Sequence, residues 1–234
     1  MRAADTAFFD FVRLVASGPF GEVSRRVKGT PALATTSSEI GATRQAASDF
    51  FLADIRHYFY RGDTALHMAA AAFRRPVAQV LVAHGANCRA RNRRGAEPLH
   101  YAADANHWNP TAQAETIEYL TSVGANPNAL DASGVAPLHR AVRTRSLAAV
   151  RALVDAGADP RQPNKAGSTP LHLAVQPTGR GGTGSEKARQ QQVGIVRLLL
   201  EHGARLTDRD GKDKQVYEAA TSDRIRRLLK EAAG

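Results

Sequence analysis

The sequence predicts an all-α repeat solenoid, and three observations lead to this fold class. A short motif that contains Leu-His occurs four times, with its histidines at His67, His100, His139 and His172. A glycine stands five residues before each histidine, and successive glycines are 33, 39 and 33 residues apart. Apolar residues after each motif recur at the helical period. Units of this length cannot bury an apolar face alone, so they are expected to stack side by side.

Each unit is expected to contain a finger, an inner helix and an outer helix. Val77, Val80 and Leu81 place one apolar stripe on the first outer helix. Proline opens three of the inner helices, where its missing N–H does no harm, and glycine closes each outer helix. The helices predicted for the first unit are 66–72 and 77–83, and those for the third unit are 138–142 and 147–155.

Two units are longer than the others. The interval from histidine to closing glycine is 18 residues in the first and third units, 24 in the second and 31 in the fourth. We therefore expect insertions at about residues 104–113 and 176–189, both between an inner and an outer helix and on the same edge of the solenoid. Insertions at one edge of a repeat array often mark its binding side.

The two ends of the chain depart from the motif. Residues 11–16 and 20–27 are predicted to form a degenerate helix pair, followed by an enlarged finger that contains a short helix. At the other end, the predicted helix 223–231 turns Ile225, Leu228 and Leu229 to one face and arginines outward. The end units of a solenoid need a polar outer face, so both ends of this chain are expected to be capping repeats.

From Gly62 to about Gly211 the chain resembles an ankyrin-repeat protein, because the motif reads Thr-Pro-Leu-His-x-Ala in its fullest form. The alanine- and arginine-rich sequence is most similar to bacterial members of that family. The resemblance implies an interaction module without catalytic chemistry, whose finger tips and inner helices contact the ligand. The predicted units of the single solenoid domain are a capping repeat at 1–61, repeats at 62–94, 95–133, 134–166 and 167–210, and a capping repeat at 211–234.

The charge and composition limit the setting and the partner. Lysine and arginine exceed aspartate and glutamate by 32 − 22 = 10, which favours an acidic protein surface, nucleic acid or an anionic membrane as partner. No apolar run is long enough to cross a bilayer, and the N-terminus lacks the order of a signal peptide. Because Cys88 is the single cysteine, no internal disulfide can form. We expect a monomer in the cytoplasm, with no membrane association.

The four motif histidines are not expected to hold a metal. Ligands of zinc converge within about 2.1 Å of one point, whereas equivalent residues of stacked units lie about 8–10 Å apart. The histidines should instead form a ladder, each bonded to the neighbouring turn. The sequence shows no other metal or cofactor site, and no triad or paired carboxylates with a supporting context.

Arginine marks the candidate contact surface. Between Thr64 and Ala96 there are six arginines and no acidic residue, and two of them, Arg93 and Arg94, stand at a finger tip. Arginine forks suit carboxylate or phosphate. Trp108 lies in the first insertion and is either a binding hot spot or the anchor of its own loop. The candidate partner-binding residues are Tyr60, Arg61, Arg93, Arg94, Trp108, Arg143, Lys165 and Arg180.

The second insertion contains a glycine-rich stretch, residues 179–187, that superficially resembles a phosphate-binding loop. Ser185 stands where that loop requires lysine, and Lys187 comes two positions late. The leading hypothesis is therefore a non-catalytic scaffold that binds an acidic protein through its concave face, fingers and insertions. Nucleic-acid binding through the basic fingers is the alternative, although no nucleic-acid motif is present. An enzyme that uses a nucleotide is a third and weaker alternative.

Overall fold

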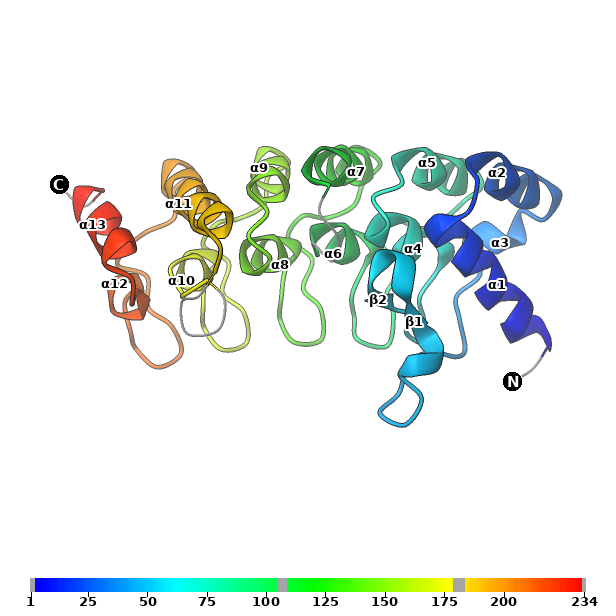
Figure 1. Ribbon diagram of the computed structural model, residues 1–234, viewed down its shortest axis with the longest axis horizontal. Helices are drawn as coiled ribbons and strands as arrows, with labels where there is room; N and C mark the ends of the chain where they lie inside the picture. Colours follow the sequence, from blue (N-terminus) through cyan, green and yellow to red (C-terminus); the bar gives the residue numbers. More distant parts are fainter. Residues whose placement is uncertain (1–2, 105–108, 179–183, 233–234) are drawn as a thin grey trace.

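The computed structural model describes residues 3–104, 109–178 and 184–232. Its helices form two parallel rows along one elongated body, with the fingers projecting beyond the lower row in Figure 1. The elements are α1 (Ala3–Ser17), α2 (Phe20–Gly29), α3 (Ala32–Thr35), η1 (Ser48–Phe50), β1 (Phe51–Leu52), η2 (Ala53–Ile55), β2 (His57–Tyr58), α4 (Ala65–Ala71), α5 (Arg75–Ala83), α6 (Pro98–Ala103), α7 (Pro110–Ser122), α8 (Pro137–Arg143), α9 (Leu147–Asp155), α10 (Pro170–Ala174), α11 (Glu186–Glu201), α12 (Val216–Ala219) and α13 (Asp223–Glu231).

Stacking of like helices forms the solenoid that the sequence predicts. The inner row runs α1, α4, α6, α8, α10 and α12, and the outer row runs α2, α5, α7, α9 and α11, each helix in contact with the next. The leucine of every Leu-His motif is buried between the rows. One continuous apolar core therefore passes through all the repeats, because no repeat could bury its face alone.

The motif histidines tie each repeat to the next. His67 accepts the Thr64 N–H at Nδ1, 3.1 Å away, so the proton of the neutral ring lies on Nε2, which donates to the Ala96 carbonyl at 3.1 Å. His100, His139 and His172 repeat both contacts with their own motif and with the following finger. Burial lowers the pKa of His67 to about 3 and that of His100 to about 4, which keeps both rings neutral. The predicted ladder of bonded histidines is confirmed.

The fingers depend on glycine and on a repeated Asx turn. Gly95 has φ +71°, and a Cβ there would lie 2.8 Å from the backbone nitrogen of Ala132 in the next finger. Asn92 closes the same finger by accepting the N–H groups of Arg94 and Ala96 on its side-chain oxygen. The equivalent side chains in the following fingers accept the same pair of bonds, namely Asp131, Asn164 and Asp210.

The N-terminal region differs in detail from the prediction. Helix α1 begins at Ala3 rather than near Phe11, because Phe8 and Phe9 continue the buried face of Phe11, Val12 and Val15. The prediction gave no bounds for the short helix in the enlarged finger, and this region contains α3 and the 3-10 turns η1 and η2. The sequence did not predict the antiparallel hairpin β1–β2, in which Phe51 pairs with Tyr58 and Leu52 with His57. This hairpin lies in front of α4 in Figure 1 and helps to form the candidate site.

The two insertions lie between inner and outer helices as predicted, but part of each one lengthens the outer helix. Helix α7 already begins at Pro110, inside the predicted insertion 104–113, because Asn109 caps it by accepting the Ala112 N–H. Helix α11 begins at Glu186, inside 176–189, where Ser185 accepts the Ala188 N–H. In the described part of the chain, no helix has the length and apolar character that crossing a membrane requires.

Candidate functional site

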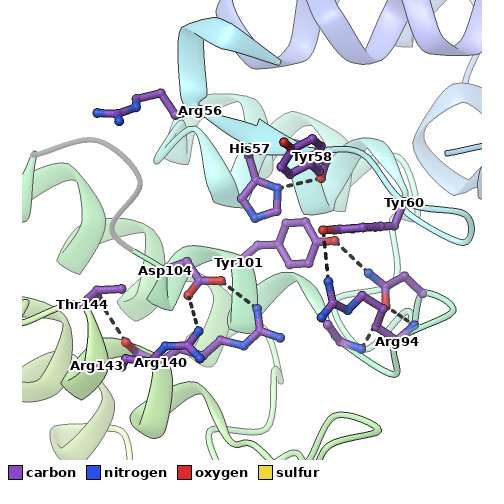
Figure 2. Close-up of a pocket in the computed structure, with 12 residues that line it drawn as sticks. Arg56, His57, Tyr58, Tyr60, Arg94, Tyr101, Asp104, Arg140, Arg143 and Thr144 are labelled. Atoms are coloured by element: carbon purple, nitrogen blue, oxygen red, sulfur yellow. Dashed lines mark hydrogen bonds and ion pairs between the residues drawn. The ribbon is translucent and has the colours of Figure 1, made fainter. Parts of the chain in front are cut away.

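A pocket of about 350 Å³ lies between the β1–β2 hairpin, the finger that precedes α6, and the inner helices α6 and α8. We refer to it as the concave pocket, because inner helices and fingers form it (Figure 2). Its lining combines aromatic rings with arginines and one carboxylate. The lining residues are Arg56, His57, Tyr58, Tyr60, Asn92, Arg94, Ala96, Tyr101, Asp104, Arg140, Arg143 and Thr144.

Tyr60 forms one wall of the concave pocket, and two arginines of the following finger hold it. The guanidinium of Arg94 lies 5.0 Å from the centre of the Tyr60 ring and that of Arg93 lies 5.5 Å from it. Arg94 also donates to the Tyr60 hydroxyl at 3.0 Å. Cation–π contacts and this hydrogen bond therefore fix the ring and one guanidinium together.

A buried carboxylate ties the walls of the concave pocket to one another. Asp63 has no exposed surface and accepts the backbone N–H of Tyr60 at 2.7 Å, the amide of Asn92 at 2.8 Å and the hydroxyl of Tyr101 at 2.9 Å. Burial raises the pKa of Asp63 to about 7, although these hydrogen bonds act in the opposite direction. One side chain thus connects the first finger, the second finger and α6.

Arg140 forms the floor of the pocket and is bonded to two carboxylates. It donates to Asp104 at 2.7 Å and to Asp131 at 2.8 Å, and all three side chains are at most 13% exposed. Burial would lower the pKa of Arg140, but the two carboxylates raise it. Burial alone would raise the pKa of Asp131. The hydrogen bonds from Arg140 and from backbone N–H groups have a larger effect, so the pKa of Asp131 is lowered. Both acids are therefore paired with Arg140.

The hairpin contributes a neutral imidazole and an exposed phenol. His57 shares a hydrogen bond of 2.7 Å between its Nδ1 and the Tyr58 carbonyl, and its ring stacks 4.4 Å from that of Tyr101. Burial is the main cause that lowers the pKa of His57. Tyr58 is 39% exposed and stacks on Phe51 at 4.9 Å. The outer rim of the pocket is therefore aromatic.

Three arginines at the pocket have side-chain N–H groups that no carboxylate among the described residues binds. The side chain of Arg56 makes no hydrogen bond or ion pair with any described residue, and the side chain of Arg94 bonds only to Tyr60 among them. Arg143 is 68% exposed and approaches Asp104 only to 3.9 Å. Because Asp104 and Asp131 are already paired with Arg140, the rim carries a surplus of positive charge.

The structure brings some of the predicted contact residues together and separates others. Tyr60, Arg94 and Arg143 line the concave pocket, and Arg93 stacks on Tyr60. Arg61 lies at the finger tip and pairs with Glu39 at 3.0 Å, with both side chains exposed. Lys165 lies two fingers away and donates to the Ala132 carbonyl at 2.6 Å, which joins neighbouring fingers. Trp108 and Arg180 fall outside the residues that the structure describes.

Most of the pocket floor was not predicted from the sequence. Tyr101 and Arg140 stand directly after the histidine of the second and third motifs, where the first and fourth have Met68 and Leu173. This variable position within a repeated motif was the available signal. Asp104 and His57 carried no comparable signal, since neither belongs to the repeated pattern.

The donors at the pocket are of the kind that can bind an anion, because guanidinium and phenol groups supply N–H and O–H donors. No group of three or more metal-ligating side chains occurs within residues 3–104, 109–178 and 184–232. In the glycine-rich insertion, Ser185 caps α11 and Lys187 lies in the first turn of that helix, so neither has the place that a phosphate-binding loop would give it.

A comparison with protein families supports the repeat assignment. A family model described as ankyrin repeats (3 copies) matches residues 40–131 and 110–210. Together the two matches cover more than half of the chain, and they include the hairpin, the four motifs and the concave pocket.

Proposed function

Because this chain belongs to the ankyrin-repeat family, whose repeats generally mediate protein–protein interaction, we propose that it is a non-catalytic scaffold that binds an acidic protein. The partner lies on the concave face, with the concave pocket at the centre of the contact. The fingers beside Tyr60 and the insertion that carries Trp108 extend the contact surface.

The observation that carries this proposal is the surplus of unpaired arginine donors around one pocket of the concave face. Arg56, Arg94 and Arg143 come from the hairpin, the second finger and α8, so residues far apart in the sequence meet at one rim. The net charge of +10 adds long-range attraction for an acidic surface. Aromatic residues and arginine are also the types enriched at binding hot spots.

The remaining predicted residues have a smaller part in the proposal. Arg61 already has an acidic neighbour in Glu39, and Lys165 is bonded to the neighbouring finger. Charges at the rim of an interface mainly change the association rate rather than the affinity. We therefore assign Arg61 and Lys165 to steering, and the residues of the concave pocket to affinity.

Affinity capture from the native host tests the proposal when three forms of the chain are compared. The wild type and Arg151→Glu should capture the same proteins, because Arg151 is exposed on the outer helix α9. The double variant Arg93→Glu/Arg94→Glu should lose them. Each captured protein is then purified and titrated against all three forms, and equal binding to all three would show that the concave face is not the contact surface.

The same proteins distinguish the nucleic-acid alternative. A protein partner should bind with equal affinity before and after nuclease treatment of the lysate. Binding of a DNA or RNA oligonucleotide that stays nanomolar at physiological salt and falls steeply as salt is raised would support nucleic acid instead. Weak binding that vanishes at physiological salt would reflect net charge alone.

A further inference from the structure

We propose that the concave pocket recognises one singly charged carboxylate side chain, Asp or Glu, in an extended segment of the acidic partner; this inference rests on the proposed function.

The size of the pocket fits a side chain. Pockets for whole small molecules have volumes of about 300–1,000 Å³, and the concave pocket, at about 350 Å³, is at the lower end of this range. The hairpin closes one side and the inner helices close the floor, so a ligand enters from the open concave face. One side chain of a peptide laid along that face can reach the floor while its backbone stays outside.

The donors of the pocket match a carboxylate. The side chain of Arg94 uses one terminal nitrogen for Tyr60, which leaves its other N–H groups without a partner among the described residues. The Tyr58 hydroxyl also makes no hydrogen bond within the described chain, and Arg143 makes only a long contact with Asp104. A guanidinium fork binds the two oxygens of a carboxylate side by side.

Of these donors, the guanidinium of Arg94 is held in place before a ligand arrives. The ring of Tyr60 lies against both Arg93 and Arg94, and its backbone N–H bonds to the buried Asp63. Asp63 also accepts the hydroxyl of Tyr101, so the finger and α6 keep a fixed separation. Fixed donors lose little conformational entropy on binding, which favours affinity.

The floor of the pocket selects for a single negative charge. Asp104 lines the pocket with its carboxylate bonded to Arg140 (Figure 2). A ligand with two negative charges, such as a phosphorylated side chain, would meet stronger repulsion from Asp104 than a carboxylate does. Like charges held close together cost free energy in a partly buried site.

A random library of displayed nonapeptides, selected on the intact wild-type chain, tests the inference. Asp or Glu should be enriched at one fixed position of the selected peptides. Replacing that residue by Gln in the best peptide should raise Kd about tenfold. The same peptide with phosphoserine at that position should bind more weakly than the original.

A double-mutant cycle locates the contact. The Arg94→Gln variant should bind the original peptide about tenfold more weakly than the wild type, and the Glu→Gln change in the peptide should then cost less than twofold. Arg143→Gln and Tyr58→Phe serve as second variants from other elements, and Arg151→Gln on the outer helix should bind like the wild type. Circular dichroism confirms that each variant is folded.

The outcomes separate the two proposals. Selected peptides without an enriched acidic position, or peptides whose acidic residue contributes equally to binding by wild type and by all three pocket variants, would overturn the carboxylate pocket and leave the scaffold function standing. Stronger binding of the phosphoserine peptide would overturn the preference for one charge. A library that yields no binder, together with no captured protein, would overturn the proposed function itself.

Discussion

The half of the concave face that contains the concave pocket and the half nearer the C-terminus have the same backbone arrangement and differ in a few side chains. In all four motifs the histidine bonds to its own helix start and to the next finger. Directly after the histidine, however, the second and third motifs have Tyr101 and Arg140, while the fourth has Leu173. Only the half with Tyr101 and Arg140 has a polar network at this position. The repeated residues therefore build the scaffold, and the variable position beside them supplies the chemistry.

Arginine has two different roles in the described part of the chain. At the C-terminal half, Arg145 donates to the carbonyls of Leu173 and Gln176, where helix α10 ends. Arg74 caps the end of α1 in the same manner by donating to Val15 and Gly18. These arginines stabilise carbonyls at helix ends, whereas those of the concave pocket face a space that a ligand can fill.

The largest expected effect is a difference between the two halves in how the free energy of unfolding depends on pH. The pKa of Asp63 is about 7 in the folded chain and near 4 in the unfolded chain. Between pH 4 and 7 the unfolded chain releases this proton while the folded chain keeps it, so the contribution of Asp63 to stability falls as pH rises. Relative to Asp63→Asn, the wild type should lose about 3 kcal/mol over this range, since each pKa unit corresponds to about 1.36 kcal/mol and the titration is incomplete at both ends of the range.

Urea unfolding followed by circular dichroism from pH 4 to 7 measures this difference. Titration of the buried histidines cancels when wild type and variant are subtracted. Asp210→Asn in the last finger is the matched control with the opposite sign. Hydrogen bonds from the backbone N–H groups of Lys214 and Lys212 lower the pKa of Asp210, so its contribution is lost only as pH falls below about 4. A flat difference for Asp63→Asn would contradict the buried network.

The second prediction concerns the floor of the concave pocket. Arg140→Met leaves Asp104 and Asp131 without their shared partner, and their side chains are only 13% and 8% exposed. Removing one member of a buried ion pair costs about 3 kcal/mol or more, because the remaining charge is unpaired. Arg143→Met, one turn away but 68% exposed, should cost less than about 1 kcal/mol. Equal free energies of unfolding for the two variants would show that the floor is not a buried pair.

The sequence predicted the shared backbone well and the pocket poorly, and the two halves show why. Four motifs in register fix where Leu66, Leu99, Leu138 and Leu171 lie, since each stacks on an equivalent neighbour. The hairpin β1–β2 occurs once, so no spacing reveals it. The bond between Asp104 and Arg140 joins residues 36 positions apart, and only the stacking of α6 on α8 brings them together.

The charge of a stretch of sequence also does not reveal the role of each of its arginines. The acid-free stretch between Thr64 and Ala96 suggested one basic surface, but its arginines have different surroundings. Arg74 caps a helix, Arg91 lies 3.4 Å from Glu97, and Arg93 and Arg94 stack on Tyr60. The partners come from other repeats or from the far end of the finger, so the sequence gives the charge of the region without the role of each arginine.

The third prediction separates two requirements of the fingers. Gly95→Ala places a side chain on a residue with positive φ, and its Cβ would lie 2.8 Å from the backbone of the next finger. Gly157→Ala also places a side chain on a residue with positive φ, but no atom lies within 4 Å of its Cβ. Gly157→Ala should lower the free energy of unfolding by about 1 kcal/mol, and Gly95→Ala by about 2 kcal/mol or more because contact between fingers is disturbed as well. If both variants lose the same stability in urea unfolding, the close approach of the fingers is not needed.

The smallest effect on the free energy of unfolding is expected at the finger tip. This variant tests whether exposed charge, rather than the polar network, distinguishes the two halves. Arg61 and Glu39 form an ion pair at 3.0 Å with 64% and 55% of their side chains exposed. Water screens such a pair, and holding two long side chains costs entropy, so Arg61→Ala should change the free energy of unfolding by less than about 0.5 kcal/mol. Its effect on binding an acidic peptide should be a slower association that disappears at high salt, because a rim charge acts mainly on encounter. Stopped-flow mixing at low and high salt measures this, and a faster dissociation at either salt concentration would place Arg61 inside the contact together with Arg94.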